Sequence, residues 1–430
     1  MELSCRPQRS TVSVLPAAGQ PPVRSKSLRR IAGGALRSRP VGLEDRDALR
    51  VLHAAFDQEG ACDADGLIGR FYTRWFALDV SLRDLFPPDM HGQRAAFAHA
   101  LHWVYGELVA QRAQEPVAFL AQLGRDHRKY GVTEAHYETL RQALYSTLRG
   151  QLADAWTDAV DDAARQSLNL ITGVMSGAAD ADDGPAWWDG TVVEHLRVSR
   201  DLAVVRLHLD RPMHYHPGQY VNVAIPQCPR RWRYLTPAIP PDDNGAVEFH
   251  VRAVPGGLVS TAIVGETRPG DRWRLSSPHG GLQVDRGGGD VLMVAGSTGL
   301  APLRSIILDL TRWGVNPRVH VFFGGRYPCE LYDLPILWQI AAHNPWLSVS
   351  PVSEYTDNPP WATDYPDVTP PRGLHVRQTG RLPEVVTKYG SWGDRQILVC
   401  GGPAMVRATK AALIAKGAPA ERIQHDPLSS

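Results

Sequence analysis

The sequence predicts a multidomain chain in which an all-α domain is followed by an antiparallel β-barrel and then by an α/β domain with a parallel sheet. Three observations predict this order. Helical periodicity runs from Leu43 to about Met175, and short alternating segments separated by turn residues follow it. The last part of the chain alternates apolar runs with helical patterns, which is typical of a parallel sheet with crossover helices. A chain of 430 residues is also too long for one ordinary domain.

These patterns set the predicted boundaries. The linker is acidic, carries Gly and Pro, and lies between the helical and the β-rich parts. We predict a tail at 1–40, an all-α domain at 41–178, a linker at 179–187, a β-barrel at 188–286 and an α/β domain at 287–430.

The composition excludes several classes of protein. Hydrophobic residues make up 43% and charged residues 21%, which fits a folded domain protein, and a net charge of +1 gives no general attraction to nucleic acid. The five cysteines form no CxxC pair, which argues against an iron–sulfur or zinc site and fits a reducing cytoplasm. No apolar run approaches the roughly 20 residues that span a membrane. We therefore expect a cytoplasmic protein with no integral membrane segment and no nucleic-acid partner.

The first 40 residues form a separate basic tail, rich in Lys, Arg, Pro, Gly and Ser. Arg29 and Arg30 precede a short apolar stretch, as in a twin-arginine signal, but Arg37 interrupts that stretch. We expect a disordered tail, with an over-long gene start as the alternative, and no export signal.

One predicted helix in the all-α part carries a histidine on its apolar face. Pro116 suits its first turn and Gly131 its end. Leu120, Gly124 and His127 recur at helical spacing, so the histidine lies on the apolar stripe. Taken alone, such a histidine is more often packed and hydrogen-bonded than a metal ligand. The alternative is a neutral imidazole offered to a metal in a dry pocket.

The order of residues around this histidine resembles the haem domain of bacterial flavohaemoglobins, through the segments FYTRWF, LRDLF, GQRAAF and DHRKYGV. The resemblance implies that His127 is the proximal ligand of a haem b iron. Tyr72 and Gln93 would be the distal pair that donates hydrogen bonds to bound oxygen. Phe86 would pack against the porphyrin, and Tyr137 would lie near His127. Tyr72, Gln93 and Tyr137 are therefore the predicted catalytic residues.

One position departs from that family. The family has a glutamate on the last helix that hydrogen-bonds the ligand histidine and raises its electron donation. Counted from Ala155 and Trp156, this position falls on Ile171, and no acid occurs between Asp162 and Asp180. We expect weaker activation of oxygen as a result.

Three motifs in the β-rich part resemble the flavin domain of the ferredoxin–NADP reductase superfamily. They occur in the expected order at domain-like spacing. Glycines in the third motif let backbone N–H groups approach a phosphate at a helix start. The motifs are YHPGQY, which ends in Gln219 and Tyr220; the segment Arg233, Tyr234, Leu235 and Thr236; and the turn Gly256, Gly257, Leu258, Val259, Ser260 and Thr261.

This resemblance implies bound FAD. Arg233 would pair with its pyrophosphate, Thr236 would lie near the flavin ring, and Val259, Ser260 and Thr261 would bind phosphate. Leu235 stands where the family has a tyrosine against the flavin. A shift of one residue would place Tyr234 there but would replace the arginine by a tryptophan, so we prefer the first register.

Two turns in the α/β part match nicotinamide-binding segments of the same superfamily. Each follows a predicted strand, where open α/β sheets bind ligands. Cys400 is expected to be a neighbour of the nicotinamide and not a nucleophile. The first turn contains Gly296, Thr298, Gly299 and Pro302, and the second contains Cys400, Gly401, Gly402 and Pro403.

The preferred nucleotide is predicted to be NADH, with NADPH possible. Arg326 could meet a 2′-phosphate, but it stands among Glu330 and Asp333 in a segment that resembles NADH-preferring reductases. The Pro-rich stretch 358–372 is expected to be a surface insertion. At the carboxyl terminus, Asp426 supplies the acid that flavohaemoglobins have near the flavin, but Leu428 replaces their phenylalanine.

The chain is thus identified as a divergent member of the flavohaemoglobins. The resemblance implies an NAD(P)H-dependent oxidoreductase in which electrons pass through FAD to haem, with nitric oxide dioxygenation to nitrate as its activity. Two alternatives remain. One is a flavin oxidoreductase with another electron donor and haem as a relay; the other is a haem-based oxygen or nitric oxide binding or sensing protein with a degenerate reductase. The sequence does not determine the oligomeric state.

Overall fold

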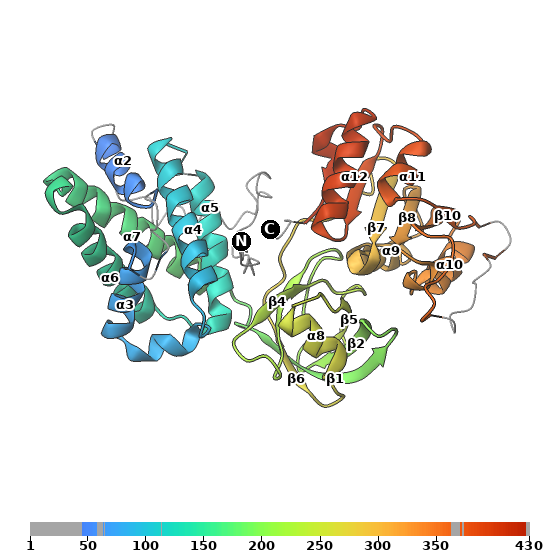
Figure 1. Ribbon diagram of the computed structural model, residues 1–430, viewed down its shortest axis with the longest axis horizontal. Coiled ribbons are helices and arrows are strands. Elements are labelled where there is room, and N and C mark those ends of the chain that lie inside the picture. Colours follow the sequence, from blue (N-terminus) through green and yellow to red (C-terminus); the bar gives the residue numbers. More distant parts are fainter. Residues whose placement is uncertain are drawn as a thin grey trace, which may run out of the picture. The chain divides into compact units, whose positions relative to one another are not determined.

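The computed structural model describes residues 45–57, 63, 65–112, 114–362, 370–371 and 374–426. The chain divides into two compact units, one ending at Trp187 and one running from Trp188 to Leu428 (Figure 1). The predicted tail at 1–40 and Leu428 lie outside the described residues. Within the described part, no helix has both the length and the apolar character needed to cross a membrane.

The first unit is all-α, as its periodicity predicted. Short 3-10 turns join its α-helices, and apolar side chains from all of these helices form one buried core. The elements are α2 (Asp45–Ala55), α3 (Leu67–Leu78), η1 (Val80–Leu85), α4 (His91–Val109), α5 (Gln114–His127), η2 (Arg128–Tyr130), α6 (Glu134–Leu152), η3 (Ala153–Ala155) and α7 (Asp158–Asp180).

A close contact between α5 and α7 explains the glycine in the predicted apolar stripe. A Cβ atom on Gly124 would lie 2.1 Å from the backbone oxygen of Met175, which no side chain can tolerate. Gly124 therefore lets the two backbones touch, one turn before His127 at the end of α5. Gly131 ends the following 3-10 turn with a φ of 72°, a conformation that favours glycine.

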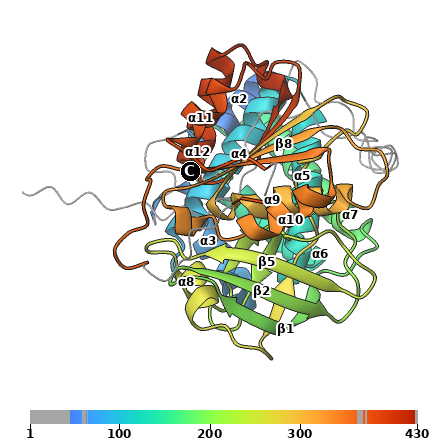
Figure 2. The same cartoon turned by 90° about the vertical axis from the view of Figure 1, so that its right-hand side faces the viewer.

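The second unit begins with a nearly closed antiparallel barrel. Its strand order is β4-β3-β6-β1-β2-β5, and a bridge from Pro237 to Phe249 joins the two edges. Strands β1, β2 and β5 run side by side in Figure 2. The elements are β1 (Trp188–Arg197), β2 (Leu202–Leu209), β3 (Val221–Ala224), β4 (Trp232–Leu235), β5 (Ala246–Arg252), α8 (Leu258–Gly265) and β6 (Arg272–Leu275).

The rest of the second unit is an α/β domain on a parallel sheet, with strand order β10-β9-β8-β7-β11-β12. The chain runs outward from β7 and then returns to the other side of β7 at β11. The elements are β7 (Val291–Gly296), η4 (Ser297–Gly299), α9 (Leu300–Leu310), β8 (Val319–Gly325), η5 (Pro328–Glu330), α10 (Leu334–His343), β9 (Leu347–Ser353), β10 (Gln378–Thr379), α11 (Leu382–Lys388), β11 (Gln396–Cys400), α12 (Pro403–Ala415), η6 (Ala420–Arg422) and β12 (Ile423–Gln424).

Both faces of this sheet are covered by helices. Val291 and Met293 of β7 pack in the cluster that includes α9 and α10, whereas Leu292 and Val294 pack in the cluster that includes α11 and α12. Because side chains alternate along a strand, β7 must be apolar on both faces, and this produces the continuous apolar run VLMVAG. The strand order reverses between β7 and β11, which is where ligands bind in such sheets.

Candidate functional site

The first unit brings Tyr72 of α3 and Gln93 of α4 together. The Gln93 side-chain amide donates a hydrogen bond of 3.4 Å to the Tyr72 hydroxyl. Tyr72 is only 5% exposed, and burial raises its pKa, with the Gln93 hydrogen bond and the charge of Arg94 as smaller opposing effects. The phenol is therefore neutral and keeps its proton as a hydrogen-bond donor.

An aromatic wall adjoins this pair. Phe86, which follows η1, packs against Tyr72, Trp75 and Phe76 with ring centroids 5.5, 5.7 and 5.5 Å away. The predicted distal residues and the predicted porphyrin neighbour thus form one cluster.

His127 ends α5 and is a neutral base. Burial lowers its pKa to about 4, with Asp126 and Lys129 as smaller influences. Its Nδ1 atom is buried and has no hydrogen-bond partner within the described residues. Such an imidazole keeps a lone pair for a metal, which is the form that a haem ligand requires.

The charged groups that act on His127 are Asp126 and Lys129, and neither lies on α7. Ile171, at the position where the resemblance expects a glutamate, is 4% exposed and part of the apolar core. Tyr137 of α6 is 6% exposed, and its buried hydroxyl has no partner among the described residues. Burial, with the nearby charge of Asp180, raises the pKa of Tyr137 to about 12.

These residues fit a haem. In the described part of the chain, no three His, Cys, Asp or Glu side chains converge as a metal site. A porphyrin supplies four of the iron's ligands itself and needs only one neutral imidazole from the protein. His127, half-buried with its Nδ1 atom fully buried, supplies that imidazole. Tyr72 and Gln93, both neutral, supply the polar donors, and the aromatic wall supplies apolar packing.

In the barrel, the Gln219 side chain stabilises the turn formed by the YHPGQY motif. The Gln219 side chain accepts a hydrogen bond of 2.8 Å from the His216 backbone and donates one of 3.3 Å to the Gly280 carbonyl. Tyr220 packs edge-to-face on Tyr234 with ring centroids 5.0 Å apart. Gln219 thus shapes the site, and the aromatic pair forms part of its surface.

Strand β4 turns Tyr234 and Leu235 in opposite directions. Tyr234 is 48% exposed beside Tyr220, whereas Leu235 packs against the barrel core. Thr236 follows the strand and is half-buried. The exposed aromatic ring of this segment is therefore Tyr234, although the motif aligns Leu235 with the family's tyrosine.

Arg233 on the same strand is a cation without an anion. Its guanidinium donates a hydrogen bond of 2.8 Å to the Trp232 carbonyl, and no acid in the described residues pairs with it. Burial and the neighbouring Arg231 lower its pKa, so the charged form gains from any bound anion. This arrangement fits the pyrophosphate of FAD.

The predicted phosphate turn leads into α8. Gly256 has a φ of 76°, and Gly257 caps the helix without a side-chain hydrogen bond. The Ser260 hydroxyl accepts a hydrogen bond of 3.1 Å from the Val254 backbone and so fixes the turn, while Val259 is buried beneath it. The first N–H groups of α8 are left for an anion, as at any helix start.

The two nicotinamide turns meet at the reversal of the sheet. A Cβ atom on Gly299 would lie 2.4 Å from the carbonyl oxygen of Cys400, so the turns after β7 and β11 are in backbone contact. Gly401 has a φ of 155° and faces Met405. Burial, with the charge of Asp426, raises the pKa of the Cys400 thiol, which agrees with its predicted role as a neighbour and not a nucleophile. The remaining motif residues lie beside this contact: Gly296 ends β7, Thr298 lies in η4, Pro302 lies in α9, Gly402 caps α12 and Pro403 begins it.

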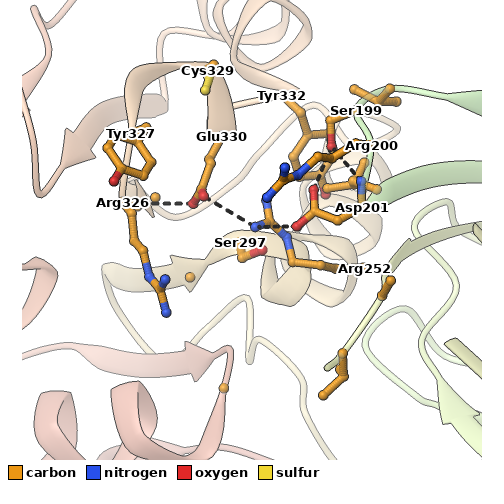
Figure 3. Close-up of a pocket in the computed structure, with 18 of the residues that line it drawn as sticks. Ser199, Arg200, Asp201, Arg252, Ser297, Arg326, Tyr327, Cys329, Glu330 and Tyr332 are labelled. Atoms are coloured by element: carbon orange, nitrogen blue, oxygen red, sulfur yellow. Dashed lines mark hydrogen bonds and ion pairs between the residues drawn. The ribbon is translucent and has the colours of Figure 1, made fainter. Parts of the chain in front are cut away.

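A cavity of about 790 Å³ joins the barrel to the α/β domain (Figure 3). Gly256 and Thr261 of the phosphate turn line it together with Gly296 and Gly402 of the nicotinamide turns. The predicted phosphate-binding and nicotinamide-binding segments therefore share one space, of the kind that a dinucleotide needs to reach a flavin.

Asp426 also lies where the barrel meets the α/β domain. A Cβ atom on Gly280 of the barrel would lie 3.4 Å from its carboxylate, and its charge acts on Cys400. Burial raises the pKa of Asp426 to about 6. The acid predicted near the flavin is thus half-buried between the two halves of the reductase unit.

Sequence reasoning missed a buried polar network beneath the cavity. Glu248 of β5 accepts from His250 at 2.9 Å and pairs with Arg304 of α9 at 3.0 Å. His250 also contacts the Tyr332 hydroxyl at 2.8 Å, and Arg304 pairs with Asp333 at 2.9 Å. These contacts tie the barrel to the α/β domain. A charged residue within an apolar strand, as in AVEFHV, was the one available signal.

Comparison with known proteins agrees with this architecture. The family models for globins, for the oxidoreductase FAD-binding domain and for the oxidoreductase NAD-binding domain match residues 69–175, 189–284 and 293–411. The structure of a flavohaemoglobin from Malassezia yamatoensis with bound FAD and haem has a TM-score of 0.68 at 14% identity, covering 91% of this chain and all of that one.

The reductase half also resembles curated reductase components. The chain is 32% identical over 245 residues to the phenol 2-monooxygenase reductase component DmpP of Pseudomonas sp. (strain CF600), covering 55% of this chain and 66% of that protein. It is 33% identical over 221 residues to the naphthalene 1,2-dioxygenase reductase component of Pseudomonas putida, covering 51% and 62%. The chain thus spans about two thirds of the length of these relatives.

The fold and the domain matches define a haem–flavin oxidoreductase, in which a globin is joined to an FAD- and NAD-binding module. This is the architecture of the flavohaemoglobins, so the predicted fold class, family resemblance and cofactor classes are confirmed.

Proposed function

We propose that this oxidoreductase is a nitric oxide dioxygenase, which converts nitric oxide and oxygen to nitrate with electrons from a nicotinamide nucleotide. The single observation that carries the proposal is the Tyr72–Gln93 pair, held at 3.4 Å in the domain that also holds His127. Dioxygenation of this kind needs a hydrogen-bond donor where negative charge develops on oxygen. The flavin and nicotinamide modules supply the electrons.

The three predicted site residues of the globin, Tyr72, Gln93 and His127, each have a role that follows from the surroundings of the side chain. Haem iron, when bound, supplies the redox chemistry on oxygen and nitric oxide. Tyr72 keeps its proton because burial raises its pKa, and Gln93 holds the hydroxyl in one orientation. His127 is neutral because burial lowers its pKa, so its ring nitrogen is free to hold the iron.

The proximal side limits the reaction. Ile171 offers no acceptor to the buried Nδ1 of His127. Without a carboxylate, the imidazole donates less charge to its metal. This argues against peroxidase-like activation of oxygen. It favours a reaction that depends more on hydrogen bonds from the distal residues than on electron donation from the proximal histidine.

In the reductase unit, Arg233 and the start of α8 would hold the phosphates of FAD, since they offer a cation that pairs with no acid among the described residues and free backbone N–H groups. The paired turns after β7 and β11 would hold the nicotinamide half of the nucleotide. The curated relatives over this half are reductase components of oxygenases, which agrees with a module that draws electrons from a nicotinamide nucleotide.

The test is nitrate formation from nitric oxide and oxygen by the full chain loaded with haem and FAD. We expect His127→Ala to abolish it, and Tyr72→Phe, which removes the buried hydrogen-bond donor, to lower its rate by about tenfold. The proposal fails if His127→Ala removes the haem absorption but leaves nitric oxide consumption unchanged.

A second candidate is a reductase that passes electrons to a separate protein. It is favoured by the DmpP similarity, because that protein is the reductase component of a multicomponent enzyme. In this case His127→Ala would leave NAD(P)H-dependent reduction of an external acceptor such as cytochrome c at full rate. Wild-type protein would also form nitrate no faster than the variant.

A further inference from the structure

The residue after the predicted haem ligand binds the segment that leaves the globin. Arg128 directly follows His127 and begins η2. Its Nη1 atom lies 3.0 Å from the Asp182 carboxylate, and its Nη2 atom donates a hydrogen bond of 2.5 Å to the Gly184 carbonyl. Both partners lie in the linker at 181–187, between the end of α7 and the barrel. One side chain therefore joins the end of the histidine-bearing helix to the linker.

This linker clamp, formed by Arg128, Asp182 and Gly184, is shielded from solvent. The Arg128 and Asp182 side chains are only 18% and 22% exposed, and the Nη1 atom that faces the carboxylate is buried. A shielded, forked contact holds its partners in one geometry better than an exposed ion pair does. The other carboxylate oxygen of Asp182 accepts the Gly184 backbone N–H at 3.0 Å, so the linker folds into a turn that presents both acceptors to Arg128.

The clamp shortens the tether between the two units. Trp188, the first residue of β1, is fixed in the barrel, because its side chain packs in the barrel core and its indole N–H donates a hydrogen bond of 3.3 Å to the Pro212 carbonyl. Three residues, 185–187, separate Gly184 from Trp188, and the chain between them spans at most about 14 Å. Without the clamp, the free segment would begin at Asp180, where α7 ends, and would span at most about 28 Å. The clamp therefore halves the reach of the tether.

We propose that Arg128 is a positioning residue for electron transfer from FAD to haem, because it keeps the reductase unit on a short tether. The inference rests on the electron path of the proposed function and adds no chemical step to it. The effective concentration of one tethered unit around the other falls roughly as the −3/2 power of the tether length. Doubling the reach should therefore lower the rate of productive encounter, and with it the rate of haem reduction, about threefold.

The test is anaerobic stopped-flow absorption of the full-length holoprotein mixed with NADH, and with NADPH in parallel. One trace then follows both flavin bleaching and haem reduction. In Arg128→Leu and in Asp182→Asn, we expect haem reduction to be about threefold slower and flavin bleaching to keep the wild-type rate. The asparagine keeps an oxygen for the Gly184 N–H and removes only the charge that faces Arg128. The double variant should be no slower than Arg128→Leu, because both substitutions break the same contact.

Two further variants separate the clamp from a general role of arginine in this helix. Arg128→Lys keeps the charge without the forked donors, so its haem reduction should be slowed less than in the leucine variant. Arg125→Leu is the matched control. It removes another half-buried arginine of α5, whose guanidinium contacts Gln122 of the same helix, and should keep the wild-type rate. Hydrogen exchange of the amides in 181–187 should be faster in both clamp variants and unchanged in Arg125→Leu.

Haem reduction at the wild-type rate in both Arg128→Leu and Asp182→Asn would overturn the inference. So would slowing that multiplies to about ninefold in the double variant, since the two residues would then act separately. If Arg128→Leu does not bind haem, Asp182→Asn carries the test, because it leaves α5 and η2 unchanged. Failure of nitrate formation with haem reduction slowed as expected would reject the dioxygenase activity and keep the role of the clamp. A wild-type haem that neither nucleotide reduces would reject both.

Discussion

The two units of the molecule prepare their sites in opposite ways. In the globin, burial keeps every key group neutral: it raises the pKa of Tyr72 and lowers that of His127 to about 4. In the reductase, two of the key groups, Arg233 and Arg326, are cations that pair with no acid among the described residues. The difference follows the ligands, because a porphyrin is a large apolar ring and a dinucleotide carries phosphates. Substitutions at three positions of the reductase test this difference between neutral and charged binding groups.

Asp426 is the largest exception to this comparison. It lies in the reductase, yet burial favours its neutral form, as burial does for His127 in the globin. Its pKa rises from 3.8 to about 6, which corresponds to roughly 3 kcal/mol between folded and unfolded states. The folded state binds the extra proton, so stability should fall as pH rises from about 4 to 6 and stay low above that. Asp426→Asn should remove this loss. Urea unfolding of holoprotein, followed by flavin fluorescence at pH 4.5 and 7.5, checks it; a variant that gains nothing at pH 7.5 would contradict it.

Arg233 gives the next largest effect. Arg233→Leu removes a half-buried cation that pairs with no acid among the described residues, and we expect FAD to bind about tenfold to a hundredfold more weakly. Arg233→Lys, which keeps the charge but not the forked donors, should lose less. Equilibrium dialysis of FAD measures both. Unchanged affinity in the leucine variant would remove Arg233 from the site.

Tyr234 gives the smallest effect and distinguishes the two motif registers. Tyr234 is exposed beside Tyr220, whereas Leu235 packs on the barrel core. Tyr234→Leu should weaken FAD binding by about threefold to tenfold, the range of one aromatic contact. Repeating the titration with FMN, which lacks the adenosine, shows which ring of FAD the tyrosine contacts. An FAD affinity equal to the wild type would exclude both contacts.

The sequence predicted the fold well because periodicity reports which face of each element is buried. The apolar run of β7 is buried in the structure, and so are Leu120 and Gly124 of the stripe on α5, whereas His127 is half-buried. The family resemblance gave Tyr72 and Gln93, which lie 21 residues apart, as a distal pair, and the structure brings their side chains together. The motif order carried that prediction, since spacing alone does not say which helices touch.

The partners of individual side chains were not predictable. Glu330 and Asp333 stand close to Arg326 in the sequence and favoured NADH, yet one binds its own loop and the other turns into the buried network. Gln219 belongs to a flavin motif, but its side chain accepts a hydrogen bond from the His216 backbone within the same turn. Trp361 of the Pro-rich insertion lines the cavity, with Arg200 of the barrel 4.5 Å from its ring centroid. These contacts depend on tertiary packing, which local patterns do not record.

The central claim is that one chain carries electrons from a nicotinamide nucleotide through FAD to a haem on His127. The most direct measurement is the absorption spectrum of purified holoprotein during anaerobic titration with NADPH, with NADH in parallel. We predict that the flavin bands bleach and that the haem Soret band then moves to its ferrous position. In His127→Ala the flavin should still bleach, with no Soret band to follow. A wild-type flavin that bleaches while the haem stays ferric, or a flavin that neither nucleotide reduces, would contradict the account.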